Sequence, residues 1–212
     1  RPQLKKVELL PILSFGVPGL IAIGGSWALN EADKVIVAHE VGLHQAGIYA
    51  AAAGLASIMM TFNQSLTNAL YPEMFRRLSL SEKTHWKIVL HYLFVFGMLA
   101  SCFGALVVAA YLILGDLLLP PRYSGARDVF IALVATGVVV SIYRPFGLLA
   151  EYLKWGRRRA LAITLGGGLT ILVGFLGVKN GGLLWAPVGV AVGYICAALV
   201  LAAGLSRQAR SS

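Results

Sequence analysis

Long apolar stretches alternate with short polar breaks along the chain. A membrane-spanning helix needs about 20 mostly apolar residues, and six stretches qualify. Their approximate bounds are residues 9–38, 46–70, 88–114, 129–150, 160–178 and 183–205. Nothing alternates with period two over segments of about ten residues, as the strands of a membrane barrel would. The pattern predicts an all-α fold in which residues 1–212 form a single polytopic bundle of six transmembrane helices.

Composition supports a membrane location. The 212 residues are 58% hydrophobic and 13% charged, whereas a soluble domain carries about 25% charged residues. A net charge of +9 would suggest a nucleic-acid partner in a soluble protein. Here the basic residues lie in short loops between apolar stretches, where they orient a chain in the bilayer. We therefore expect membrane lipids around the chain and no nucleic acid bound to it.

The basic residues of the loops are shared unequally between the two sides of the membrane. Most of them precede the first helix, follow the last, or lie in residues 72–87 and 151–159. The opposite side receives only Arg122, Arg127 and Lys179. Because basic loops stay in the cytoplasm, both termini are predicted to be cytoplasmic. The chain begins at Arg1 and has its first methionine at Met59, so we expect it to be a piece of a longer protein.

A charged cluster interrupts the first apolar stretch. Glu31, Asp33 and Lys34 lie close together there, and a charge at the centre of a bilayer costs at least a few kcal/mol. The cluster therefore either lies at the membrane interface or faces a water-filled interior that handles a polar or charged solute. Glu31 and Lys34, three positions apart, could also simply pair with each other.

The second apolar stretch carries amide and hydroxyl side chains. Thr61, Gln64 and Asn68 share one face of a helix, and Asn63 and Thr67 lie on a neighbouring face. Such residues either form hydrogen bonds between helices or line a hydrophilic cavity. The sequence leaves both interpretations open.

Arg144 is the candidate cation of the fourth stretch, near its cytoplasmic end. A long arginine side chain can extend to the interface. Alternatively, it points inward, where a planar guanidinium suits bidentate recognition of phosphate.

Small residues recur at helical spacing and predict close helix packing. Small side chains let helix backbones approach each other in lipid, where van der Waals contact drives association. The rows are Gly189 with Gly193, residues 166–168 with Gly174, and Ala46 with Ala50 and Gly54.

The sequence shows no pattern typical of an enzyme or of a cofactor-binding protein. The 4 histidines form no ligand cluster. Cys102 and Cys196 lie inside apolar stretches without metal-ligand spacing. There is no phosphate-binding glycine loop and no catalytic-triad spacing. We expect no catalytic residues, no metal and no cofactor.

Several motifs resemble those of polysaccharide flippases, the Wzx-type exporters of O-antigen and exopolysaccharide. The segment from Leu10 to Ile36, followed by Val41 to Ala50, resembles the seventh and eighth helices of that family. Asp33-Lys34 stands where an Asp-Arg pair is usual, and Tyr71-Pro72 is expected to close the second helix. Segments near the expected tenth, eleventh and last helices match further motifs; they are residues 122–127, 154–159 and 180–194.

The resemblance implies half of a twelve-helix transporter. These flippases belong to the multidrug/oligosaccharidyl-lipid/polysaccharide exporter superfamily, in which two bundles enclose a cavity that opens to each side in turn. The implied location is the bacterial cytoplasmic (inner) membrane. The implied substrate is an undecaprenyl-pyrophosphate-linked oligosaccharide, moved across without sugar chemistry. Implied partners are the N-terminal half of the same transporter, a polysaccharide polymerase and a chain-length regulator.

The same resemblance assigns roles to the polar residues. Lys34 and Arg144 would meet phosphate or acidic sugar charge. The amides that would bind saccharide hydroxyls are those of Asn63, Gln64 and Asn68. Asp33 would take part in ion coupling or simply balance Lys34.

Two other functions remain open from the sequence. One is a cation-coupled multidrug antiporter of the same superfamily, which should prefer acidic residues in its lumen. The other is a membrane assembly subunit that transports nothing and needs no polar stripe.

Overall fold

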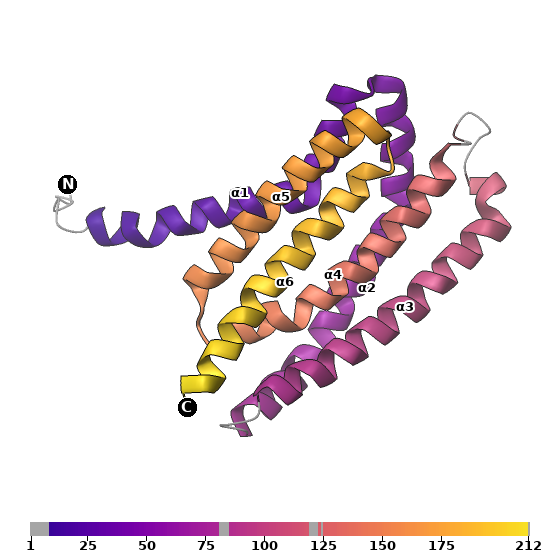
Figure 1. The fold of residues 1–212 in the computed structure, drawn as a ribbon. Coiled ribbons are helices and arrows are strands. Elements are labelled where there is room, and N and C mark those ends of the chain that lie inside the picture. The colour runs from indigo at the N-terminus through magenta and orange to yellow at the C-terminus, as the bar shows by residue number, and fades with distance from the viewer. Residues whose placement is uncertain (1–8, 81–84, 119–122, 124, 212) are drawn as a thin grey trace, which may run out of the picture.

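The computed structural model describes residues 9–80, 85–118, 123 and 125–211, and this part of the chain is all helical (Figure 1). The helices are α1 (Leu9–Glu40), α2 (Leu43–Leu80), α3 (His85–Leu118), α4 (Ala126–Tyr152), α5 (Gly156–Gly181) and α6 (Trp185–Ser211). The prediction of an all-α fold with six helices is confirmed.

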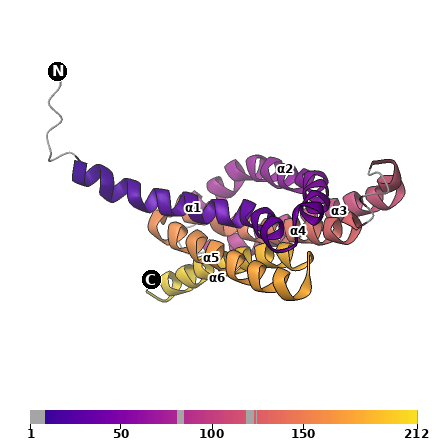
Figure 2. The same ribbon diagram turned by 90° about the horizontal axis from the view of Figure 1, so that it is seen from above.

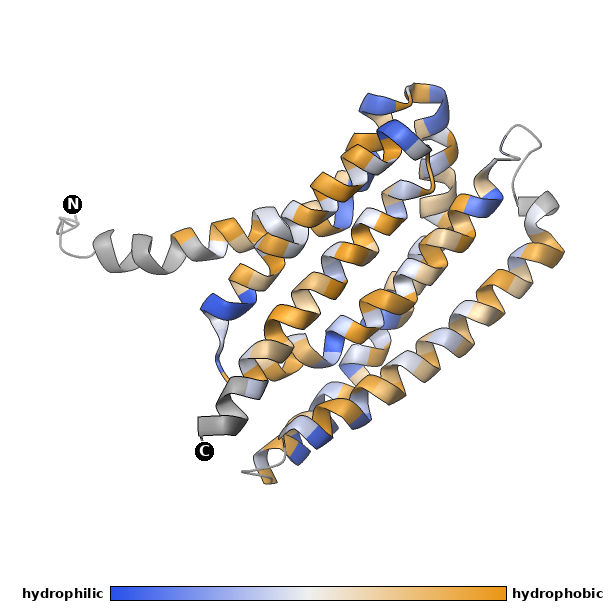
Figure 3. Cartoon of the chain, in the orientation of Figure 1, coloured by the Kyte–Doolittle hydropathy of each residue, from blue (hydrophilic) through white to orange (hydrophobic). Residues whose placement is uncertain are grey.

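Five of the six helices are long and apolar enough to cross a membrane. The five spans are Leu43–Leu80, Trp86–Gly115, Ala126–Tyr152, Gly156–Gly181 and Trp185–Ser206. The protein is therefore a multi-pass membrane protein. Figure 3 shows hydrophilic residues gathered at several helix ends, while the middles of the helices are mostly hydrophobic. That α1 also crosses the membrane stays a prediction.

The second helix is longer than its apolar stretch predicts. It continues through Pro72 to Leu80, so the prediction that Tyr71-Pro72 closes it is wrong. A proline removes one backbone hydrogen bond but permits a helix to continue with a kink. The last turns are amphipathic: Met74 and Leu78 are buried in a core cluster, where their packing stabilises the extension.

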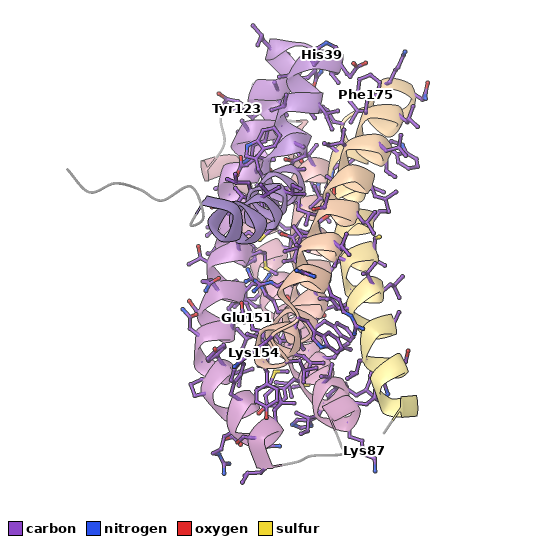
Figure 4. All side chains as sticks on the ribbon, turned by 90° about the vertical axis from the view of Figure 1, so that its left-hand side faces the viewer. His39, Lys87, Tyr123, Glu151, Lys154 and Phe175 are labelled. Carbon is purple, nitrogen blue, oxygen red and sulfur yellow. The ribbon has the colours of Figure 1, made fainter. Side chains whose placement is uncertain are left out.

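The helices pack in a layered bundle with α4 at its centre. α4 contacts α2, α3 and α6, while α5 packs against both α1 and α6. Seen from above, α1 and α2 lie on one side of the bundle, and α5 and α6 lie on the other (Figure 2). In side view, Glu151 and Lys154 lie toward the same end as Lys87, and His39 lies at the opposite end (Figure 4).

Glycines join α1, α5 and α6 by direct backbone contact, as the small-residue pattern predicts. A Cβ on Gly166 would lie 2.6 Å from the carbonyl oxygen of Gly193. A Cβ on Gly167 would lie 2.6 Å from the carbonyl oxygen of Gly25, and one on Gly189 would lie 2.8 Å from the backbone nitrogen of Gly174. Real Cβ atoms do not fit at such distances, so these positions require glycine.

The row formed by Ala46, Ala50 and Gly54 behaves differently. Ala50 and Gly54 are exposed, and a Cβ on Gly54 would meet no other atom within 4 Å. The prediction that this row packs against another helix is therefore wrong for Ala50 and Gly54 within the described chain, while Ala46 does pack against a core cluster. Its small residues instead continue an open face of α2.

Candidate functional site

A stripe of polar side chains runs along one exposed face of α2. We call it the α2 stripe; it comprises Ser57, Thr61, Gln64 and Asn68, all of them exposed. Their spacing of three or four positions puts them on one side of the helix. The stripe confirms that Thr61, Gln64 and Asn68 share a face, and it shows that this face is open.

Asn63 lies on the neighbouring face of α2 and joins that helix to α4. Its side chain is fully buried, at 0% exposed. Its Nδ2 donates to the carbonyl oxygen of Gly137 at 2.8 Å, and its Oδ1 accepts from Ser141 Oγ at 2.6 Å. Thr67 donates to the Asn63 carbonyl oxygen at 2.7 Å. The amide predicted to bind saccharide is therefore engaged inside the bundle.

A polar cavity of about 320 Å³ opens beside Gln64 and Asn68, at the C-terminal end of the α2 stripe. We call it the arginine cavity. Its walls come from α2, α4 and the first turn of α5. The residues that line it are Gln64, Thr67, Asn68, Tyr71, Tyr143, Arg144, Gly147, Leu148, Glu151 and Arg159.

Arg144 points inward to this cavity and contacts one of the amides predicted to act with it, which in turn bonds to a second. Its Nη1 donates to Gln64 Oε1 at 3.3 Å, and Gln64 Nε2 donates to Asn68 Oδ1 at 3.0 Å. Its Nε is buried without a hydrogen-bond partner. No ion pair holds Arg144 within the described chain. A cation without a counter-ion therefore faces the cavity.

Arg159 is a second cation of the cavity, and the sequence pattern predicts it only as part of a basic loop. Its Nη1 forms an ion pair with Glu151, while its Nε is buried without a partner. Arg157 and Arg158 beside it are exposed. Glu151, the one carboxylate in residues 151–159, was the available signal that one of these arginines would be paired.

The charged cluster of α1 lines a second cavity of about 390 Å³, which we call the α1 cavity. It includes Asn30, Glu31, Asp33 and Lys34 from α1, Ser57 and Met60 from α2, and Thr136 from α4. Lys34 Nζ lies 2.6 Å from Glu31 Oε2, and both side chains are about half exposed. The pairing of Glu31 with Lys34 is confirmed.

Asp33 is buried, at 5% exposed, and has no cationic partner among the ion pairs of the described residues. Its Oδ2 accepts a hydrogen bond from the hydroxyl of Tyr49 at 2.5 Å, and its Oδ1 lacks a hydrogen-bond partner. Lys34 forms its ion pair with Glu31, and its charge also acts on Asp33, so the alternative in which Asp33 balances Lys34 stays a prediction.

The two cavities follow each other along α2. Met60 lines the α1 cavity and Gln64 lines the arginine cavity. These positions are one helical turn apart, or about 6 Å along the axis. The α2 stripe therefore forms a continuous polar track between a lysine and an arginine.

No group of three or more His, Cys, Asp and Glu residues that could hold a metal ion occurs in the part of the chain that the structure describes.

A family model with the description "Polysaccharide biosynthesis protein" matches residues 1–114, more than half of the chain. The match includes α1, α2 and most of α3, and hence Lys34 and the α2 stripe. No curated protein matches the chain, and no solved structure matches it.

Proposed function

Because the chain belongs to the polysaccharide biosynthesis protein family, we propose that it moves a lipid-linked saccharide across the membrane. The substrate class is an undecaprenyl-pyrophosphate-linked oligosaccharide for surface polysaccharide, either O-antigen or exopolysaccharide. The proposed location is the bacterial inner membrane. No bond of the substrate is made or broken.

The observation that carries the proposal is the polar track on α2. A membrane protein that only packs in lipid has no use for exposed amides that line a polar cavity. Amide side chains donate and accept hydrogen bonds, as sugar hydroxyls require. A guanidinium without a counter-ion, such as that of Arg144, suits phosphate.

The geometry refines the roles assigned from the sequence. Lys34 and Arg144 meet phosphate or acidic sugar charge, and Gln64 and Asn68 bind saccharide hydroxyls. Asn63 holds α2 against α4, and we assign it no contact with substrate. Asp33, buried beside the α1 cavity, is the proposed ion-coupling group.

The open face of α2 also supports a missing partner. We propose that the N-terminal half of the same transporter covers the α2 stripe and encloses the transport pathway. In this arrangement both ends of the chain are cytoplasmic. A polymerase and a chain-length regulator would act on the saccharide after its transfer.

The test is export of surface polysaccharide by cells that depend on variants of this protein. Lys34→Ala and Arg144→Ala should each reduce export roughly tenfold or more, because hydrogen bonds to charged groups contribute about 1.5–3 kcal/mol. The amount of protein in the membrane should stay the same.

Arg158→Ala is the matched control. Arg158 stacks on Trp155 at 4.6 Å and lines neither cavity, so its loss should leave export intact. Normal export by both the Lys34 and the Arg144 variants would refute the proposal.

A cation-coupled multidrug antiporter is the second candidate, and the buried Asp33 is the observation that favours it. The arginine cavity disfavours this candidate, because its positive charge would repel a cationic drug. Efflux of a cationic dye that depends on Asp33, with polysaccharide export unaffected, would establish this alternative.

A further inference from the structure

The arginine cavity contains more hydrogen-bond donors than the surrounding acceptors use. A guanidinium carries five N–H donors. Arg144 has one hydrogen bond, a long one to the neutral Gln64, and its Nε has none. Arg159 is paired through Nη1 with Glu151, and its Nε is also without a partner.

The charges of the cavity are also unbalanced. Its walls hold the cations Arg144 and Arg159 but a single carboxylate, that of Glu151. One positive charge is therefore left over while Glu151 is in place. A diphosphate bridging a lipid and a sugar carries two negative charges, so it matches the cavity fully only when both arginines are available.

We propose that Arg144 and Arg159 together bind the diphosphate of the lipid-linked substrate, and that Glu151 occupies Arg159 only until the diphosphate displaces it. The inference rests on the proposed function and adds to it a second phosphate-binding residue and a counter-ion that leaves. Glu151 thus acts as an internal substitute for the second phosphate.

The position of the ion pair permits this exchange. The side chains of Arg159 and Glu151 are 38% and 39% exposed, so water can solvate the carboxylate once it leaves. Exposed ion pairs contribute little to stability, so their separation opposes binding only weakly. In return, phosphate can form a bidentate, charge-assisted pair of hydrogen bonds with Arg159.

The size of the cavity locates the rest of the substrate. A volume of about 320 Å³ is at the lower end of ligand pockets, which suits a head group and not an oligosaccharide. The saccharide would then extend along the α2 stripe toward Lys34 in the α1 cavity. Phosphate and sugar would occupy successive parts of one track.

The experiment measures binding of geranyl diphosphate, a short soluble analogue of the lipid head, to the full-length protein in nanodiscs. Arg144→Gln and Arg159→Gln should each weaken binding roughly tenfold, as expected for the loss of a charged hydrogen-bond donor. Glu151→Gln should instead tighten it by about two- to fivefold, the effect of removing a competitor in an exposed ion pair.

Three comparisons make the test specific. The double variant Glu151→Gln with Arg159→Gln should bind no better than Arg159→Gln alone, because Glu151 acts through Arg159. The preference for geranyl diphosphate over geranyl monophosphate should disappear in Arg159→Gln. Arg157→Gln removes an exposed charge on the same turn, outside the cavity, and should change nothing.

Each contrary result has a distinct meaning. If Glu151→Gln binds no more tightly than the unaltered protein, the displacement of Glu151 is wrong. If both arginine variants bind normally and unfold at the usual temperature, the phosphate site is wrong. Equal affinity for inorganic pyrophosphate would show a site for a free anion and overturn the lipid-linked assignment. Export of polysaccharide, measured separately in cells, decides the proposed function itself.

Discussion

The outer face of α3 and the open face of α2 are both exposed, yet they are built for different surroundings. On α3 the exposed side chains include many large apolar ones; Leu106 is 64% exposed and Ile113 is 80% exposed. On the open face of α2 the exposed residues are mostly small or polar, from Ala50 and Gly54 to Gln64 and Asn68, although Ile58 is also 47% exposed. Lipid accommodates the first face but leaves the amides of the second without hydrogen-bond partners. Exposure alone therefore does not identify a lipid-facing surface; the chemistry of the exposed atoms does.

The largest effect should come from placing the same charge on each face. Leu106→Lys puts an ammonium group into lipid, which costs up to about 3 kcal/mol near the bilayer centre. Thr61→Lys puts it on the α2 stripe, where water or a polar partner can solvate it. The fraction of each variant inserted in the membrane measures the difference. Equal insertion of the two variants would mean that α2 and α3 face the same medium.

A smaller effect should separate the two faces within α2. Asn63→Leu removes two buried hydrogen bonds between α2 and α4, those with the Gly137 carbonyl oxygen and with Ser141 Oγ, which keep a bond of 3.1 Å to each other. At roughly 0.5–1.5 kcal/mol for each bond, the loss should cost about 1–3 kcal/mol. Asn68→Leu, on the open face, should leave the free energy of unfolding nearly unchanged. Unfolding of both variants in mixed micelles provides the measurement. A larger loss in Asn68→Leu would place the structural contact on the wrong side of the helix.

The smallest effect is expected at the ion pair of the α1 cavity. Glu31 and Lys34 are about half exposed, and such pairs contribute about 0–1 kcal/mol. Glu31→Gln should therefore change the free energy of unfolding by less than about 1 kcal/mol. It leaves Lys34 free for an anion, so export should persist. Loss of folding in Glu31→Gln would show that the pair is buried by something beyond the described chain.

The sequence predicts the helices well because a membrane span is a local property of composition. It underestimates the length of α2, since the turns after Pro72 are held by Met74 and Leu78 packing against other helices. The polar face of α2 is likewise predictable from spacing. Which of its two polar faces stays open is not, because that depends on Gly137 and Ser141 in α4 receiving Asn63.

Arg159 is the cavity residue whose role the sequence does not reveal. Several basic residues follow one another in residues 154–159, and their order does not reveal which one turns inward. The turn between α4 and α5 decides it, with Lys154 at a positive φ of 53° just before the helix begins. That turn fixes the rotation of α5 and directs Arg159 toward Glu151, while Arg157 and Arg158 stay exposed.

The glycine contacts between α1, α5 and α6 have a mechanical consequence. Where backbone contacts backbone, no flexible side chain lies between the helices to accommodate sliding. We therefore expect the three helices to move as one rigid body. Between α2 and α3 the contact is instead made by side chains, such as the stacked rings of Phe62 and Phe103. We therefore expect a change of shape that alters access to the polar track to occur at such side-chain contacts, with α1, α5 and α6 moving as one body.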